Sequence, residues 1–185
     1  MTVKFLREIL EWIVVVVVSI VIYLVLSTYV IAPFTVKGHS MDYTFADNDK
    51  VFVNKLSKNY KRGDEVVFHA NETDDYIKRI IGVPGDTIEY KNDVLYVNGQ
   101  KVDEPYLEQK IKEAKSEGNS PLTPDFNIEY LSSTKSKTVP EGTYFVMGDN
   151  RQHSTDSRIF GFVKKEAMIG KVSLRYYPLK SFKFF

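Results

Sequence analysis

The chain has 185 residues, with 25 Lys and Arg against 24 Asp and Glu, so its formal net charge is +1. This balance excludes nonspecific attraction to nucleic acid, and a hydrophobic content of 43% excludes a disordered chain. The chain has no cysteine, which excludes disulfides, thiolate metal sites and a Cys nucleophile. We therefore expect one folded domain plus an accessory segment, with no metal, no cofactor and no nucleic-acid partner.

The first predicted element is an apolar segment in which no charged residue occurs between Trp12 and Val36. The part from Trp12 to Ile31 has the roughly 20 residues that a helix needs to cross a bilayer. A lone strand in lipid would leave its backbone groups unpaired, so we predict a transmembrane helix and assign residues 12–33 to it. The alternatives are a buried core helix and a cleaved secretory signal, but the run exceeds a signal core and no small-x-small cleavage pattern follows it.

Charges at the start of the chain predict the orientation of this helix. Lys4 and Arg7 precede it, and the positive-inside rule then places residues 1–11 in the cytoplasm and residues 34–185 outside the cell. Lys37, just beyond the other end of the helix, acts against this orientation. We expect a single-pass protein of the cell membrane that contacts the lipid bilayer.

After Pro33 the pattern predicts mainly β structure, because short runs of β-branched and aromatic residues are separated by Gly, Pro, Asn and Asp. Asn98-Gly99 predicts a type I′ hairpin, in which both central residues must accept positive φ. Pro84-Gly85-Asp86 predicts a second turn. The predicted strands are Lys50–Asn54, Glu65–His69, Tyr76–Val83, Thr87–Tyr90, Val94–Val97, Thr143–Gly148 and Gly170–Tyr177.

One segment of the β-rich part, at about residues 104–137, has a different composition. It is rich in Lys, Glu, Ser, Asn and Pro and has weak periodicity. We therefore predict an insertion that leaves the β core and lies on the solvated surface.

Three segments far apart in the sequence contain residue types that can carry chemistry. They are Gly38–Met41, Asp75–Arg79 with Gly82–Asp86, and Gly148–Arg158. In this order, behind a membrane helix, they resemble the type I signal peptidase family, membrane-bound serine proteases that remove signal peptides from exported pre-proteins. The resemblance extends over nearly the whole chain, as far as Gly170-Lys171-Val172, and the single helix, short insertion and lack of Cys resemble the Gram-positive branch.

The resemblance implies a fold and a reaction. It implies an antiparallel β-sheet catalytic domain with a small inserted subdomain, with pre-proteins as substrates and no cofactor. Ser40 matches the nucleophile and Lys78 the general base. Since Lys accepts a proton only when it is neutral, its pKa must fall from about 10.4, and burial among apolar side chains lowers it. Tyr76, Ile77 and Ile80 are expected to supply that surrounding.

A Ser-His-Asp triad is the alternative to this dyad. His39 adjoins Ser40, but on extended chain its side chain points to the opposite face. His153 lies near Asp149 and Asp156 in the sequence and approaches Ser40 only if the fold brings it there. We expect replacement of His153 to leave turnover largely intact.

The third segment supplies residues that support the site by resemblance. Ser154 matches a serine whose hydroxyl bonds to the lysine amine and orients it. The backbone N–H of Ser40 is the expected oxyanion donor. Gly38 stands where some members add a Ser donor, and its lack of a side chain lets substrate backbone approach. The charged residues expected to brace the site are Asp149, Arg151, Asp156 and Arg158.

The resemblance also implies a substrate with small residues at the first and third positions before the cut, held as an extended strand beside a β edge. After the nucleophile the family usually has Ser-Met-x-Pro-Thr-Leu, whereas this chain has Tyr43 for the Pro and Phe45 for the Leu. We expect these departures to alter specificity or efficiency. The residues that match the pocket neighbourhood, with ordinary core packing as the alternative, are Phe34, Val36, Met41, Phe45, Tyr76 and Ile77.

Two other functional classes share some of these sequence features. An inactive paralogue could act as a membrane-anchored binding module, which would not depend on Ser40. Self-cleaving repressors share the dyad, but they carry a DNA-binding domain where this chain has an apolar helix. Aromatic residues near the end of the chain are expected either to contact the membrane or to pack in the core: Tyr176, Tyr177, Phe182, Phe184 and Phe185.

Overall fold

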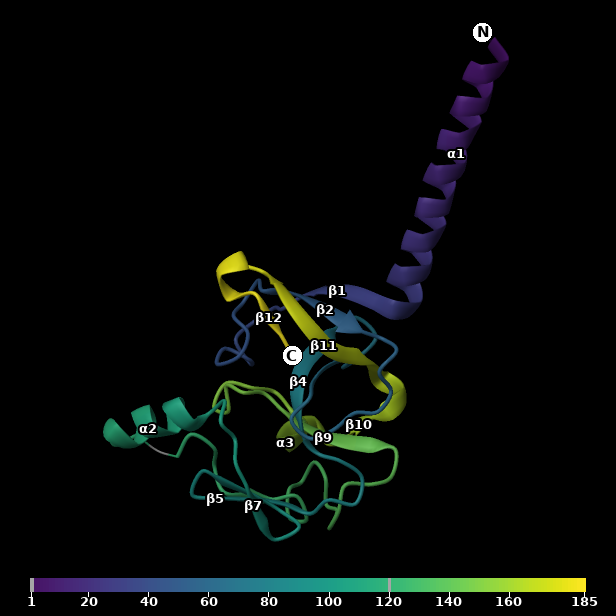
Figure 1. Cartoon of the computed structure of the whole chain (residues 1–185). Coiled ribbons are helices and arrows are strands. Elements are labelled where there is room, and N and C mark those ends of the chain that lie inside the picture. The colour runs from purple at the N-terminus through teal and green to yellow at the C-terminus, as the bar shows by residue number, and fades with distance from the viewer. Residues whose placement is uncertain (1, 120) are drawn as a thin grey trace.

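The structure is a computed structural model that describes residues 2–119 and 121–185. It begins with a long helix, α1 (Thr2–Val25), which continues through a π-helical turn (Leu26–Val30) and projects away from the rest of the molecule (Figure 1). Within the described residues, one helical stretch, Arg7–Val30, is long and apolar enough to cross a membrane, and none of it is buried.

The predicted helix is thus confirmed, but its C-terminal boundary at residue 33 is wrong. Ile31–Thr35 form strand β1, and Ile31, Ala32 and Pro33 lie opposite Asn54, Val53 and Phe52 of the next strand. Backbone pairing to a neighbouring strand ends the helix here, and such pairing cannot be inferred from hydropathy.

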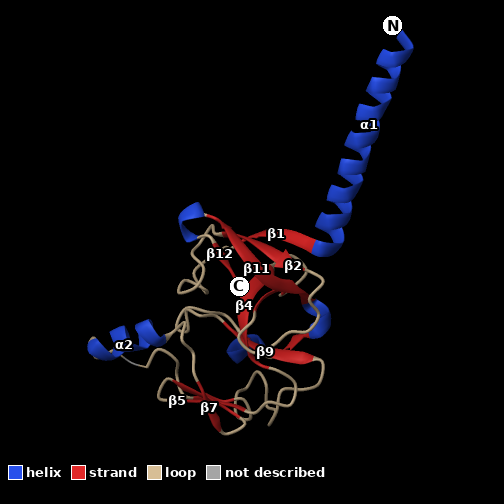
Figure 2. Ribbon diagram, in the orientation of Figure 1, coloured by secondary structure: helices blue, strands red, loops and turns tan. Residues whose placement is uncertain are grey.

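The rest of the chain forms two antiparallel sheets (Figure 2). The larger sheet has the order β1-β2-β11-β3-β4-β9-β10, with β12 paired to β11, and the smaller has the order β7-β6-β5-β8. The further strands of the larger sheet are β2 (Lys50–Asn54), β3 (Glu65–His69), β4 (Asp75–Gly82), β9 (Thr143–Met147), β10 (Val163–Lys164), β11 (Met168–Tyr177) and β12 (Lys183–Phe184). Those of the smaller sheet are β5 (Ile88–Lys91), β6 (Val94–Val97), β7 (Gln100–Val102) and β8 (Phe126–Asn127).

Each predicted strand is present, and both predicted turns are confirmed. Asn98 and Gly99 have φ values of 53° and 75°, as a type I′ turn requires, and they join β6 to β7. Gly85 has φ 88°, and the Asp86 amide donates to the Val83 carbonyl at 3.1 Å across the other turn.

The segment predicted as an insertion is more integrated than expected. It contains α2 (Glu108–Ser116) and strand β8, which pairs with β5 and so belongs to the smaller sheet. That sheet begins with β5 at Ile88, before the predicted start of the insertion at residue 104. Leu107, Leu122 and Ile128 are buried. Single apolar residues separated by polar ones anchor this segment, and such isolated anchors produce no periodic signal.

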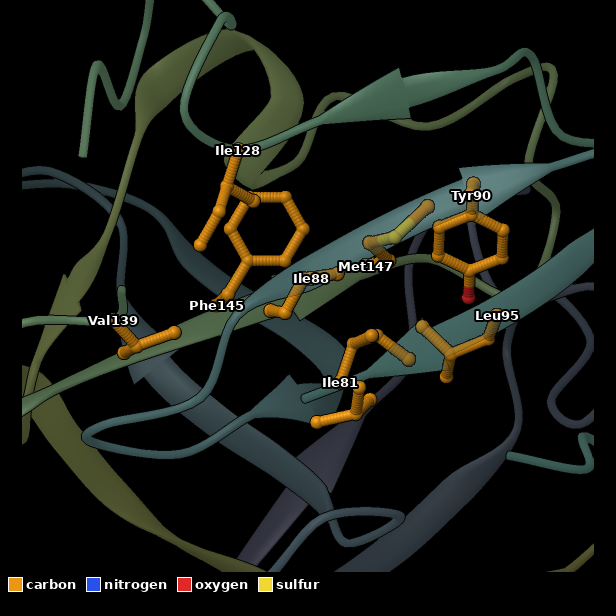
Figure 3. Close-up of a cluster of buried hydrophobic side chains, with 9 residues drawn as sticks. Ile81, Ile88, Tyr90, Leu95, Ile128, Val139, Phe145 and Met147 are labelled. Carbon is orange, nitrogen blue, oxygen red and sulfur yellow. The ribbon is translucent and has the colours of Figure 1, made fainter. Parts of the chain in front are cut away.

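The largest core cluster joins the two sheets (Figure 3). Ile81 and Phe145 come from the larger sheet, whereas Ile88, Tyr90 and Leu95 come from the smaller one, and all are buried. Because the sheets share this apolar core, they form one packed unit. The short helices that complete the chain are α3 (Ser157–Phe160) and the 3₁₀ turns Lys165–Ala167 and Leu179–Ser181.

A second cluster positions the loop between β1 and β2. In the sheet order, β1 and β4 are four strand steps apart, about 19 Å at about 4.8 Å per step in a flat sheet. Met41 and Phe45 of the loop pack with Val53 of β2, Val67 of β3 and Ile77 of β4. The loop therefore folds across the sheet and carries Ser40 from the β1 edge to β4.

Candidate active site

Ser40 lies in a compact turn that is fixed from two directions. Beneath it, the Phe45 amide donates to the Met41 carbonyl at 2.7 Å, and both side chains are buried. From the side, the Asn150 amide donates to the Ser40 carbonyl at 3.0 Å and its Nδ2 donates to the His39 carbonyl at 2.9 Å. The nucleophile candidate is thus held against the segment that follows β9.

Lys78 of β4 reaches this turn. Its Nζ lies 2.7 Å from Ser40 Oγ and donates to the Ile77 carbonyl at 3.1 Å. The side chain is buried, and this desolvation lowers the pKa of Lys78 to about 8, while the charges of Asp156 and Asp149 act in the opposite direction. A larger fraction of the amine is therefore neutral near physiological pH than in an exposed lysine, which suits it to accept a proton from a hydroxyl.

The two histidines near Ser40 make different contacts. The His39 ring lies 3.0 Å from the Asp42 carboxylate through Nδ1. His153 lines the same cleft as Ser40, but within the described residues neither ring is hydrogen-bonded to Ser40 Oγ. The contact that a base must make is made by Lys78.

Ser154 is packed against the site without a direct bond to the lysine. Its Oγ is buried and has no hydrogen-bond partner among the described residues, so the expected bond to Lys78 is not formed in this structure. A Cβ at Gly148 would collide with Ser154 Oγ and with the Ser40 carbonyl. Glycine at position 148 is therefore what lets these two segments meet beside the dyad.

The charged residues predicted to brace the site form two ion pairs beside the dyad. Asp149 is bound by Arg79, through Nε at 2.9 Å and Nη2 at 2.7 Å, and accepts a bond of 2.5 Å from Thr44 Oγ1. Asp156 is bound in the same bidentate manner by Arg158, with both bonds at 2.8 Å. The contacts of Asp149 tie β4, the nucleophile turn and the third segment together, whereas the pair of Asp156 and Arg158 lies within the third segment.

Arg151 is fully buried but pairs away from the dyad. Its Nη2 donates to Glu104 Oε1 at 2.5 Å, and its Nη1 donates to Tyr90 OH at 2.7 Å. Its Nε donates to the Gly148 carbonyl at 3.1 Å. Arg151 therefore links the smaller sheet to the chain beside the site, through the Gly148 carbonyl and through its own carbonyl, which accepts from Arg158 Nη2 at 2.7 Å.

A cleft of about 220 Å³ opens over the dyad. Of the predicted site residues, it is lined by Phe34, Gly38, Ser40, Tyr76, Ile77 and Lys78. Val36, Met41 and Phe45, also predicted near the substrate pockets, are not among its lining residues and are at most 1% exposed in the core cluster below. Their role in substrate binding stays a prediction, and the structure shows them packed in the core beside Val53 and Ile77.

The comparisons with known proteins decide the family. The family model described as signal peptidase, peptidase S26, matches residues 9–177. The chain belongs to the signal peptidase family. As a member it is a serine endopeptidase, a hydrolase, and the alternative of a self-cleaving repressor is excluded.

Relatives of this signal peptidase family member match it over most of its length. Signal peptidase IB of Staphylococcus aureus (strain MRSA252) is 45% identical over 183 residues, covering 96% of this chain and 94% of the relative. Signal peptidase I of Bacillus caldolyticus is 48% identical over 170 residues, 90% of this chain and 91% of the relative. The crystal structure of a signal peptidase I from Enterococcus faecalis V583 has a TM-score of 0.56 at 44% identity, covering 62% of this chain and 97% of that one.

The two departures from the usual signal peptidase motif lie outside the cleft. The Phe45 ring packs on that of Phe185, with centroids 4.8 Å apart, below the guanidinium of Arg175 at 5.7 Å. Tyr43 faces the inserted helix, where Lys110 Nζ lies 5.6 Å from its ring centroid. Both residues thus connect the nucleophile turn to neighbouring elements rather than line the space above Ser40.

Four residues of this signal peptidase site were missed by the sequence analysis. Arg79 and Thr44 hold Asp149, Glu104 pairs with Arg151, and Asn150 binds the nucleophile turn. Arg79 and Asn150 lie within the predicted motif segments, which was the available signal for them, whereas Thr44 and Glu104 lie outside those segments. Among the described residues, no group of at least three His, Cys, Asp or Glu side chains is arranged to hold a metal ion.

Proposed function

We propose that the protein is a membrane-anchored signal peptidase in which Ser40 is the nucleophile and Lys78 the general base. The observation that carries this proposal is the 2.7 Å contact between Ser40 Oγ and the buried Lys78 Nζ, whose pKa is lowered to about 8. A buried lysine next to a serine hydroxyl is an activated nucleophile pair.

The reaction runs in two stages. Lys78 takes the proton from Ser40 Oγ as the oxygen attacks the scissile carbonyl, and the protonated amine then gives that proton to the leaving amine. Water attacks the resulting ester, Lys78 accepts a proton from the water, and the proton returns to Ser40 as the acid product leaves. Within the described residues the Ser40 amide donates to no acceptor, so it is free to bind the oxyanion.

The substrate binds as an extended strand beside β4, in the cleft that Phe34 of β1 also lines. β9 pairs with β4 from Arg79 onward, so among the described strands Asp75–Lys78 has one unpaired edge. That edge offers backbone donors and acceptors to an incoming peptide, while Phe34 and Ile77 line the cleft for its side chains.

Helix α1 tethers this site to the bilayer that holds the signal peptide. It is apolar and exposed, and it leads within one π-helical turn into β1, at the cleft. Tethering enzyme and scissile bond to one surface raises their effective concentration.

Cleavage of a purified pre-protein by the full chain in detergent tests the proposal. The unaltered chain should cut after a small-x-small sequence, and Ser40→Ala and Lys78→Ala should each lower kcat by at least about 10³-fold. His153→Ala, in the same cleft, is the matched control and should retain most activity. Activity that survives in Lys78→Ala but is lost in His153→Ala would overturn the dyad.

A further inference from the structure

A second pocket adjoins the catalytic cleft. It has a volume of about 360 Å³, in the range of about 300–1,000 Å³ typical of ligand pockets. It shares Tyr76 and Thr155 with the cleft over the dyad, so the two spaces are neighbours separated by these side chains. Its apolar lining comes from Phe68, Tyr76, Phe160, Phe162, Val163 and Ala167.

The walls of this pocket are aromatic and fixed by the catalytic segment. Phe160 has ring-centroid distances of 6.2 Å to Phe68 and 6.5 Å to Tyr76, yet remains 40% exposed. Its amide donates to the Asp156 carbonyl at 3.0 Å. The carboxylate of Asp156 in turn binds Arg158 beside the dyad. An exposed aromatic ring held by the bracing residues of the site is positioned to contact substrate.

The direction of the substrate follows from the position of the helix. β1 follows α1 in the chain and lies at its end, whereas α3 and β10, which carry Phe160 and Val163, lie farther from the helix (Figure 1). The signal peptide stays in the bilayer, so the residues before the cut approach from the β1 side. The substrate residues after the scissile bond, which lie beyond Ser40, are then directed toward the second pocket.

We propose that this pocket is a subsite for a large apolar side chain in the first three residues after the scissile bond. The proposal rests on the proposed function, and it adds a preference in the exported protein itself. An extended chain advances about 3.3 Å per residue and turns alternate side chains to one face. One of these early residues therefore faces the pocket, while exposed Asn71 and Lys164 at its rim leave the next residues in solvent.

A peptide series measures this preference with the full chain in detergent. The peptides share one sequence before the cut and carry Phe or Ser at the first, second or third position after it. At one position, Phe should raise kcat/KM about tenfold over Ser, mainly through a lower KM. A tenfold change corresponds to about 1.4 kcal/mol of binding free energy from burial of the ring. In Phe160→Ser this Phe-to-Ser ratio should fall to near one.

Ile159→Ser is the matched control. Ile159 adjoins Phe160 on α3 and is 66% exposed, but it does not line the pocket. This variant should keep both the rate and the ratio of the unaltered chain. A ratio near one at all three positions in the unaltered chain, or an unchanged ratio in Phe160→Ser, would overturn the subsite while leaving Ser40-dependent cleavage in place.

Photocrosslinking to full-length Ser40→Ala locates the substrate without turnover. A benzophenone side chain at the preferred position after the cut should label the 68–71 or 160–164 segments, and one at the third position before the cut should label β1. Labelling of β1 by the probe after the cut would contradict the inference. Absence of both labels, together with no cleavage by the unaltered chain, would instead defeat the proposed function and this subsite with it.

Discussion

At the scale of single residues, the protonation of Lys78 decides activity. Its pKa of about 8 means that the amine is mostly protonated at lower pH, where it cannot accept the Ser40 proton. We predict that kcat/KM rises about tenfold per pH unit below pH 8 and levels off above it. A pH–rate profile of the full chain checks this, and a flat profile between pH 5 and 8 would exclude Lys78 as the base.

The same burial lowers the stability of the folded state. Lys78 has a pKa of about 8 when folded and about 10.5 when unfolded, so between these values the unfolded chain binds more protons. Stability therefore rises with pH from 8 to 10.5, and below pH 8 the protonated amine destabilises the native state. We predict that Lys78→Met is more stable than the unaltered chain at pH 7, by about 1–3 kcal/mol, and that the difference shrinks toward pH 10.5.

Chemical denaturation followed by far-UV circular dichroism at pH 7 and pH 10 measures this difference. Lys112→Met is the matched control, because Lys112 is exposed and, among the described residues, forms an ion pair only with Glu108 of the same helix. This control should show no such pH dependence. A Lys78→Met chain that is less stable at both pH values would show that the amine stabilises the fold.

At the scale of elements, β11 and the chain end support the turn that carries the nucleophile. Arg175 donates to the Thr44 carbonyl at 2.7 Å and to Asp49 at 2.9 Å, and Phe185 covers Phe45. The nucleophile turn thus depends on residues more than one hundred positions later in the chain. Phe182 and Phe184 of the same end are exposed, whereas Phe185 packs against the core, and membrane contact by the exposed pair stays a prediction.

This arrangement predicts the effect of restoring the usual motif at position 45. Phe45→Leu should lower the free energy of unfolding by about 1 kcal/mol, because the ring contact with Phe185 is lost. It should leave the choice of residue before the cut unchanged, since Phe45 does not line the cleft. Cleavage of peptides with Ala, Gly or Val at that position is the measurement, and a changed order of preference would contradict the structure.

At the scale of the whole molecule, we propose that the apolar helix crosses the membrane, with residues 1–11 in the cytoplasm and the β-rich part outside the cell. Because the chain has no cysteine, a single introduced cysteine reports its own side of the membrane. We predict that Lys112→Cys in intact cells reacts with a membrane-impermeant maleimide, whereas Arg7→Cys reacts only after permeabilisation. Both positions are exposed, so accessibility within the fold does not limit the reaction. The reverse pattern would invert the proposed orientation.

Local sequence patterns determined much of this protein. The apolar run from Trp12 onward, the β-branched runs and the positive-φ turn at Asn98-Gly99 each act through neighbouring residues, so their structures were predicted correctly. The family motifs also predict Ser40 and Lys78 as a pair, and their side chains are in contact.

Only the tertiary structure decided which residues meet. Asp149 pairs with Arg79 and Arg151 with Glu104, and Met41 and Phe45 lie under the cleft instead of in it. β11 lies between β2 and β3 in the sheet, although its residues are near the end of the sequence. These choices depend on burial and charge pairing between segments tens of residues apart, and the free energy of such contacts exists only once the sheets have packed together.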